Sequence, residues 1–264
     1  VRHESGVTRQ LRPGLQDPTA NSAASASPPA FYALRPGAWR DYVTLLHPPY
    51  TIWHLSYVVM GAALAPTVHY DRLSASLLAF FLALGLSAHA LDELNGRPLQ
   101  THISDGVLRA IAVGGIAGAV GLGVLGAALV SPWLLAFVAF GAFMAPAYNL
   151  EWFHGRLHSD LWFAIAWGAF PFLTSYWVGA EHFAPAAGVG AVAVLLVSLV
   201  QRVLSKRVRD IRRRARVIVG HVTYVSGEAH EIDRAWVIAT DESALMLLSV
   251  ALALLSIAIL VARM

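Results

Sequence analysis

Cysteine is absent from this chain of 264 residues, which excludes a disulfide framework, a thiolate metal site and a cysteine nucleophile. Charge is scarce as well, because Asp, Glu, Lys and Arg make up only 13% of the residues, whereas soluble globular domains carry about 25%. Hydrophobic residues reach 57%. A chain of this balance is too apolar for a water-soluble globule, and it indicates a membrane protein.

Long stretches without Asp, Glu, Lys or Arg define the apolar segments of the chain. These stretches cover residues 51–68, 73–91, 110–150, 161–180, 183–201 and 243–262. The stretch 110–150 is about twice as long as a helix that crosses a hydrocarbon core of about 30 Å, so we expect two helices that turn at Ser131 and Pro132. Backbone groups in lipid have no water to bond, which requires the segments to be helical. The sequence therefore predicts an all-α polytopic transmembrane bundle of about seven spans.

The basic residues predict how the bundle is oriented. When the spans alternate across the bilayer, every Lys and Arg except Arg72 and Arg263 falls on the face that carries the N-terminus. By the positive-inside rule this face is cytoplasmic. We therefore expect a multi-pass protein of the cell membrane, with its N-terminus in the cytoplasm and its C-terminus outside.

Two parts of the chain differ in composition. Residues 1–44 predict a cytoplasmic tail and an interfacial segment, because residues 1–30 are rich in Ser, Ala, Pro and Gly and aromatic and basic side chains follow. Residues 45–264 predict the transmembrane helical domain, which includes a cytoplasmic segment at 205–242. Within this segment, valines alternate with polar residues around Ser226 and Gly227, which indicates a β-hairpin or a hairpin-like lid.

A polar motif ends the second apolar segment. His89, Asp92 and Glu93 stand at positions i, i+3 and i+4 and so share a helix face, and Asn95 follows Asp92 by three residues. Mg²⁺ prefers oxygen ligands of this kind together with phosphate oxygens. A carboxylate at a membrane boundary is costly and indicates a functional site. In the alternative interpretation, the two carboxylates only end the helix and pair with nearby arginines.

A row of basic residues follows the sixth segment. Lys206, Arg209, Arg213 and Arg216 recur at helical spacing and can hold a phosphate through charge-assisted hydrogen bonds. Asp210 is the acidic residue of this row. Basic clusters beside a span also bind anionic membrane lipids, and this alternative stays open. Nucleic acid is not indicated, because the row adjoins a transmembrane segment and no reader motif is present.

The polar motif resembles that of a known family. The run from His89 to Thr101 looks like the first aspartate-rich motif of the UbiA-type intramembrane prenyltransferases, in which an Asn and spaced aspartates at the cytoplasmic end of the second helix precede an Arg-Pro-Leu-like turn. The run from Tyr148 to Pro171 is similar to the family's link between helices four and five. The resemblance extends over residues 45–215.

The resemblance implies a transferase that moves an isoprenyl group from an isoprenyl diphosphate to a lipophilic acceptor, with Mg²⁺ as cofactor. Asp92, Glu93 and Asp210 would be catalytic and, together with Asn95, would hold the metal. The side chains that would contact the substrate are His89, Asn95, Arg97, Tyr148, Trp167, Phe170, Lys206, Arg209 and Arg213.

Two other functions stay open. A non-catalytic relative would bind lipid or a protein partner, and a membrane terpene cyclase would use the ionisation site without an acceptor. Members of the family usually have several aspartates in each motif, whereas Asp210 stands alone in the second region here, which favours the non-catalytic relative. Against this, the arginines of the basic row could replace one metal ion in stabilising a leaving diphosphate.

Overall fold

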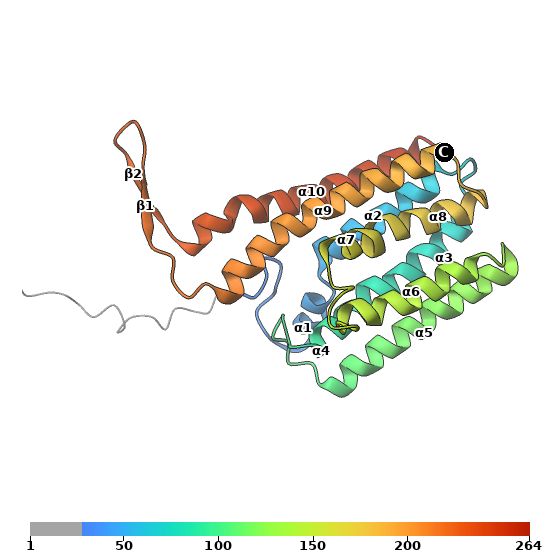
Figure 1. Ribbon diagram of the computed structural model, residues 1–264, viewed down its shortest axis with the longest axis horizontal. Coiled ribbons are helices and arrows are strands. Elements are labelled where there is room, and N and C mark those ends of the chain that lie inside the picture. The colour runs from blue at the N-terminus through green and yellow to red at the C-terminus, as the bar shows by residue number, and fades with distance from the viewer. Residues whose placement is uncertain (1–27) are drawn as a thin grey trace, which may run out of the picture.

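Helices make up most of residues 28–264, the part of the chain that this computed structural model describes. They form one bundle in which the long helices run roughly side by side (Figure 1). The tail predicted for residues 1–30 falls almost entirely outside the described residues. The short helix expected near the first span is present as α1 (Ala38–Leu45).

Five helices are long and apolar enough to cross a membrane, which supports a transmembrane protein. Two of them contain a π-helical segment between α-helical ends. The five are α3 (Tyr70–Phe80) with η1 (Phe81–Ala88) and α4 (His89–Leu94), α5 (Asp105–Leu129), α7 (Asp160–Phe163) with η2 (Ala164–Ala169) and α8 (Phe170–Ala180), α9 (Pro185–Arg214), and α10 (Arg234–Val261).

Two shorter helices complete the match with the predicted segments. They are α2 (Pro48–Leu64), with 17 residues, and α6 (Leu134–Asn149), with 16. All the predicted apolar segments coincide with helices, and the turn expected at Ser131 and Pro132 separates α5 from α6. The pattern of apolar length therefore located every long helix of the described chain.

Helix starts follow the local sequence. The side chains of Ser104, Ser159 and Asp233 each accept a hydrogen bond from a backbone N–H in the first turn of the helix that follows. These caps satisfy donors that have no partner within the helix. Proline occupies the first turn of α2 and of α9, where its missing N–H leaves no gap in the hydrogen bonding.

A buried carboxylate anchors α1 to the loop that follows α4. Asp41 accepts hydrogen bonds from the backbone N–H of Gly37 at 3.0 Å and of His102 at 2.9 Å. Burial by itself raises the pKa of Asp41, but these hydrogen bonds and the His102 side chain outweigh burial and hold that pKa below its usual value. The segment before the first long helix is thus packed against the bundle.

The predicted hairpin is confirmed by β1 (Gly220–Thr223) and β2 (Ala229–Ile232), which pair antiparallel with Gly220 opposite Ile232. Gly227 adopts a φ of +87° at the turn, a conformation that favours glycine. Figure 1 shows the hairpin projecting away from the bundle rather than covering one of its ends. Both ends of the predicted segment 205–242 are helical, because α9 continues to Arg214 and α10 begins at Arg234.

Ion pairs join α9 and α10 near the hairpin. Arg212 donates two hydrogen bonds to the carboxylate of Glu242, at 2.5 and 2.9 Å. Arg207 pairs with Asp241 at 3.4 Å. The bidentate pair fixes the relative position of the two helices more strictly than a single contact would.

The core of the bundle is built on α2, which packs against α8 and α10. Trp53 of α2 is fully buried. Gly61 lies where α8 comes closest, and a Cβ at this position would be 2.2 Å from the backbone oxygen of Phe172. This contact requires glycine, because a backbone atom cannot move aside as a flexible side chain can.

The variant Gly61→Ala should therefore unfold at a lower temperature than the wild type in detergent. Overpacking of a close contact typically costs about 1–3 kcal/mol. Gly114→Ala is the matched control, because a Cβ there meets nothing within 4 Å and alanine is the better helix former. Equal unfolding temperatures for the two variants would contradict the close approach of α2 and α8.

Candidate functional site

Polar side chains from separate parts of the chain gather where α4 ends and the basic half of α9 begins. We call this set the polar cluster. Its members come from the segment before α2, from α2, η1–α4 and α6, and from α9. They are Tyr32, His47, Tyr50, His89, Asp92, Tyr148, Arg202, Arg209 and Arg213.

Asp92 lies near two arginines of α9. The half-buried carboxylate of Asp92 lies within electrostatic range of Arg213 and Arg209. It makes no ion pair with any residue of the range 28–264. Two of the predicted site regions, separated by more than a hundred positions in the sequence, therefore lie near one another.

The arginines of this region differ in their partners. Arg202 pairs with Asp160 at 3.0 Å, and Arg212 pairs with Glu242. Arg209 donates to the hydroxyl of Ser205 at 3.0 Å and, within the described chain, has no carboxylate at ion-pair distance. Arg213 likewise has none among residues 28–264. Arg209 is half-buried whereas Arg213 is exposed, and guanidinium groups without a counter-ion favour an anion.

Aromatic residues from the N-terminal side enclose the cluster. The Tyr32 hydroxyl lies 2.8 Å from Nδ1 of His47, and the His47 ring stacks on His89 with 4.0 Å between ring centres. Nε2 of His47 is buried without a hydrogen-bond partner among the described residues. Tyr32 and Tyr50 lie within electrostatic range of Arg209 and Arg213. Their hydroxyls are therefore close to the guanidinium groups.

Burial keeps the side chains of His47 and Tyr32 neutral. It lowers the pKa of His47 well below the usual value, and the charges of His89 and the two arginines act in the same direction. Burial also raises the pKa of Tyr32 well above that of an exposed tyrosine. At physiological pH, His47 is therefore neutral, and its Nε2 can accept a hydrogen bond when Nδ1 carries the ring proton.

Tyr148 forms the opposite side of the cluster. Its ring stacks on His158 with 4.4 Å between ring centres and packs on Trp167 at 4.5 Å. Its buried hydroxyl has no hydrogen-bond partner within the described residues. Of the aromatic residues predicted to contact substrate, Tyr148 and Trp167 thus lie together, whereas Phe170 lines a separate apolar crevice among α3, α5, α6 and α8.

Glu93 holds the loop that follows α4 through buried hydrogen bonds. Its side chain is fully buried, and its oxygens accept hydrogen bonds from the backbone N–H of Leu99 at 2.9 Å and of Thr101 at 2.8 Å, and from the Thr101 hydroxyl at 2.9 Å. Successive helix residues point about 100° apart, so Glu93 holds the loop after α4 while Asp92 faces α9. The structure gives the Glu93 carboxylate a role in the loop, and its role as a metal ligand beside Asp92 stays a prediction.

Asn95 and Arg97 also hold this loop and do not join the polar cluster. Asn95 donates through its side-chain amide to the backbone oxygen of Asn149 at 3.0 Å. Arg97 donates to the backbone oxygens of Thr101 and Ile103, at 3.0 and 2.6 Å, and pairs with Asp105. The side chains of Asn95 and Arg97 therefore hold the turn that follows α4.

Asp210 and Lys206 lie on other faces of α9. Asp210 is exposed and pairs with Arg214 at 3.1 Å, one helical turn along. Lys206 is exposed and pairs with Asp160 at 3.7 Å. Asp210 is therefore engaged with a neighbouring arginine at the surface of α9, and its role as a second metal ligand stays a prediction.

The donors suit Mg²⁺ only in part. Within residues 28–264, no group of three or more His, Asp or Glu side chains is arranged to hold a metal ion. Mg²⁺ is commonly held by one or two carboxylates together with substrate phosphates and water. Asp92 fits such a role if a phosphate supplies the remaining ligands.

Comparison with known proteins gives no neighbour for this chain, since no family model, no curated protein and no solved structure matches it.

Replacing Glu93 tests its structural role. Glu93→Gln exchanges an acceptor oxygen for an amide donor that faces the N–H of Leu99 or Thr101, and each buried donor left unpaired costs about 1–3 kcal/mol. We expect a clear fall of the unfolding temperature in detergent. Asp92→Asn makes the same chemical change at the neighbouring position and should cost far less. A larger loss of stability in Asp92→Asn would contradict the assignment of the two roles.

The buried neutral His47 predicts a dependence of stability on pH. Its pKa is lowered in the folded state, so the unfolded chain takes up a proton as the pH falls through about 6.5, the usual histidine value, and stability is lost below that pH. Between about pH 8 and about pH 5.5, the unfolding temperature of the wild type should fall more than that of His47→Gln. Equal changes in the two proteins would rule out burial of a neutral imidazole here.

Proposed function

We propose that this protein is an intramembrane transferase of the UbiA type, which moves an isoprenyl group from an isoprenyl diphosphate to a lipophilic acceptor. One observation supports it above the others. Arg209 and Arg213 have no carboxylate partner among the described residues and lie within electrostatic range of Asp92. Two cations and one carboxylate, all free of ion pairs, match a diphosphate that is held by guanidinium groups on one side and by a metal on the other.

In this proposal each member of the polar cluster has a chemical role. Arg209 and Arg213 hold the diphosphate, and the nearby hydroxyls of Tyr32 and Tyr50 donate hydrogen bonds to it. Asp92 holds Mg²⁺, which supplies positive charge for the leaving group when bound. Together these groups would stabilise the negative charge that develops on the diphosphate as it leaves.

The reaction that follows from these roles is a substitution at an allylic carbon. The bond between this carbon and the diphosphate oxygen breaks, and its electron pair leaves with the diphosphate. The acceptor forms the new bond to the same carbon and loses a proton. Nε2 of His47, which is buried and without a partner among the described residues, is the base we propose for this proton.

The membrane arrangement is part of the proposal. We propose that α2 and α6 cross the membrane together with the five longer helices, which places the polar cluster and the N-terminus at the cytoplasmic face of the cell membrane and the C-terminus outside. The distribution of Lys and Arg supports it, since Arg72 and Arg263 alone lie at the other end.

A second candidate is a non-catalytic protein that binds anionic lipid headgroups at the same arginines. The observation that favours it is the scarcity of carboxylates, because Glu93 and Asp210 lie outside the polar cluster and Asp92 remains alone. A lipid phosphate would use the same guanidinium groups but would not need a metal at Asp92.

Ligand-dependent stability in detergent tests the transferase and separates it from the second candidate. Geranylgeranyl diphosphate with Mg²⁺ should raise the unfolding temperature of the wild type, and the rise should shrink when Mg²⁺ is removed. Arg209→Gln should lose most of the response. Asp92→Asn should lose the part that depends on Mg²⁺.

Exposed residues of the same types provide the matched controls. Asp210→Asn and Arg214→Gln remove the partners of an exposed ion pair outside the polar cluster and should respond as the wild type does. An equal response of Asp92→Asn and wild type, with and without Mg²⁺, would refute metal-assisted binding. A response to phosphatidylglycerol that matches the response to the diphosphate would favour the second candidate.

A further inference from the structure

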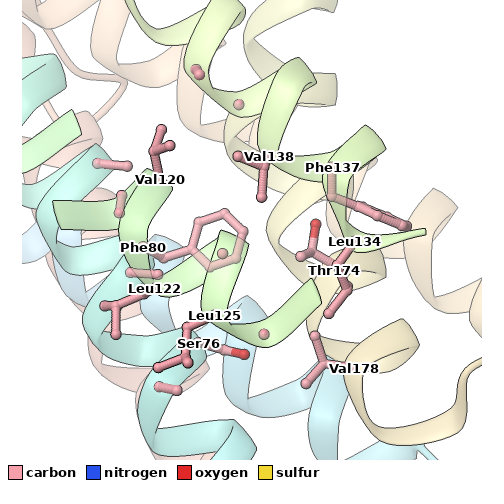
Figure 2. A pocket seen from close by; sticks show the side chains of 18 of the residues that line it. Ser76, Phe80, Val120, Leu122, Leu125, Leu134, Phe137, Val138, Thr174 and Val178 are labelled. Carbon is pink, nitrogen blue, oxygen red and sulfur yellow. The ribbon is translucent and has the colours of Figure 1, made fainter. Parts of the chain in front are cut away.

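An apolar crevice lies at the end of the bundle opposite the polar cluster, the end at which Arg72 is found. It encloses about 450 Å³ among α3, α5, α6 and α8. Figure 2 shows side chains from these helices around one space, among them Phe80, Val138 and Thr174. A volume of this size lies in the range of ligand-binding pockets, about 300–1,000 Å³.

The crevice is open on the side of α5. Leu125 and Leu129 line it and are at the same time 54% and 74% exposed. In a chain whose long helices can cross a membrane, side chains exposed at this level face lipid. Apolar cavities exclude water, so a hydrocarbon chain from the surrounding lipid is the occupant that this surface favours.

Small residues create the crevice. Ala79 of α3, Ala119 and Gly123 of α5, and Ala142 of α6 contribute to its lining. Figure 1 places α5 at the outer edge of the bundle. Only 17% of the apolar 18-residue stretch of α5 is buried inside the protein. These small side chains leave a space among α3, α5, α6 and α8 that no side chain of the described residues fills, although Phe140 of α6 meets Phe170 of α8 with 4.7 Å between ring centres.

Polar groups occur mainly at one end of the crevice. Asp71 and Arg72 stand in the first turn of α3, and Arg72 donates to the backbone oxygen of Val178 at 2.8 Å and pairs with Glu181 at 3.2 Å. Asp71 makes no ion pair within residues 28–264. Ser76, one turn further in, is buried and also lines the crevice. Charge at the mouth and apolar walls behind it match an amphipathic molecule.

We propose that the crevice binds one acyl chain of a membrane phospholipid, whose charged headgroup lies at Asp71 and Arg72. The charged mouth distinguishes a phospholipid from an isoprenoid alcohol, which has no charge to place there. The bound chain fills the space among α3, α5, α6 and α8 and adds to the direct contacts, such as that of Phe140 with Phe170, that hold the α5–α6 hairpin in the bundle. The site is separate from the polar cluster, because no member of the polar cluster lines the crevice.

Filling the crevice tests the proposal. Ala119→Phe places a ring where the acyl chain would lie. Ala117→Phe is the matched control on the same helix, because Ala117 is exposed and does not line the crevice. Each protein is purified in detergent, delipidated, and then mixed with phosphatidylethanolamine or geranylgeraniol.

We expect native mass spectrometry to find one phospholipid on the wild type and on Ala117→Phe, and phosphatidylethanolamine to raise the unfolding temperature of both. Ala119→Phe should retain at least fivefold less phospholipid, and phosphatidylethanolamine should not raise its unfolding temperature. Retention by Ala119→Phe at the wild-type level would overturn the proposal. An equal rise of the wild type with geranylgeraniol would overturn the choice of a phospholipid.

A crosslinking experiment on the wild type covers the case in which Ala119→Phe does not fold. Phosphatidylethanolamine with a diazirine in one acyl chain should label peptides of α3, α5, α6 and α8 after illumination. Labelling confined to α9 and α10 would overturn the proposal. The response to geranylgeranyl diphosphate should be the same in wild type and Ala119→Phe, so failure of this proposal can be distinguished from failure of the transferase.

Discussion

The positive charge of the half-buried Arg209 and the exposed Arg213, at the end of an apolar bundle, is the constraint on which the candidate site depends. The partly buried guanidinium group of Arg209 is costly unless an anion or dipoles compensate it. Ser205 supplies one hydrogen bond, Tyr32 and Tyr50 lie within electrostatic range, and Asp92 supplies one negative charge at a distance. This compensation within the described chain is partial, whereas the neighbouring Arg202 and Arg212 have ion pairs. The polar cluster therefore carries positive charge that the described residues do not fully compensate.

Much of the fold could be predicted because the membrane leaves few choices. A run of apolar residues long enough to cross lipid must be helical, and the turn between α5 and α6 follows from a serine and a proline in the middle of one such run. The hairpin could be predicted from alternation around Ser226 and Gly227. The ends of the helices were harder to locate, since α9 continues through the basic row to Arg214 without any proline or glycine after residue 190 to stop it.

The site could be predicted only in part, because helical spacing says which residues share a face but not which neighbour that face meets. Asp92 and Arg209 were found by their charge beside apolar segments. Glu93 and Asp210 are also acidic and directly follow Asp92 and Arg209 in the sequence. Glu93, however, accepts hydrogen bonds from the loop after α4, and Asp210 pairs with Arg214. His47 and Tyr32 carried no signal in the sequence. Their contact with His89 joins residues from different segments, and tertiary packing alone creates it.

The uninterrupted course of α9 has a mechanical consequence. One continuous helix carries the arginines of the polar cluster in its second half, and the bidentate contact of Arg212 with Glu242 fixes its last turn to α10. Residues 215–219, which form neither helix nor strand, then connect α9 to the hairpin β1–β2. A force on the projecting hairpin therefore reaches the guanidinium groups only through this irregular connection, after the ion pair has fixed the helix end.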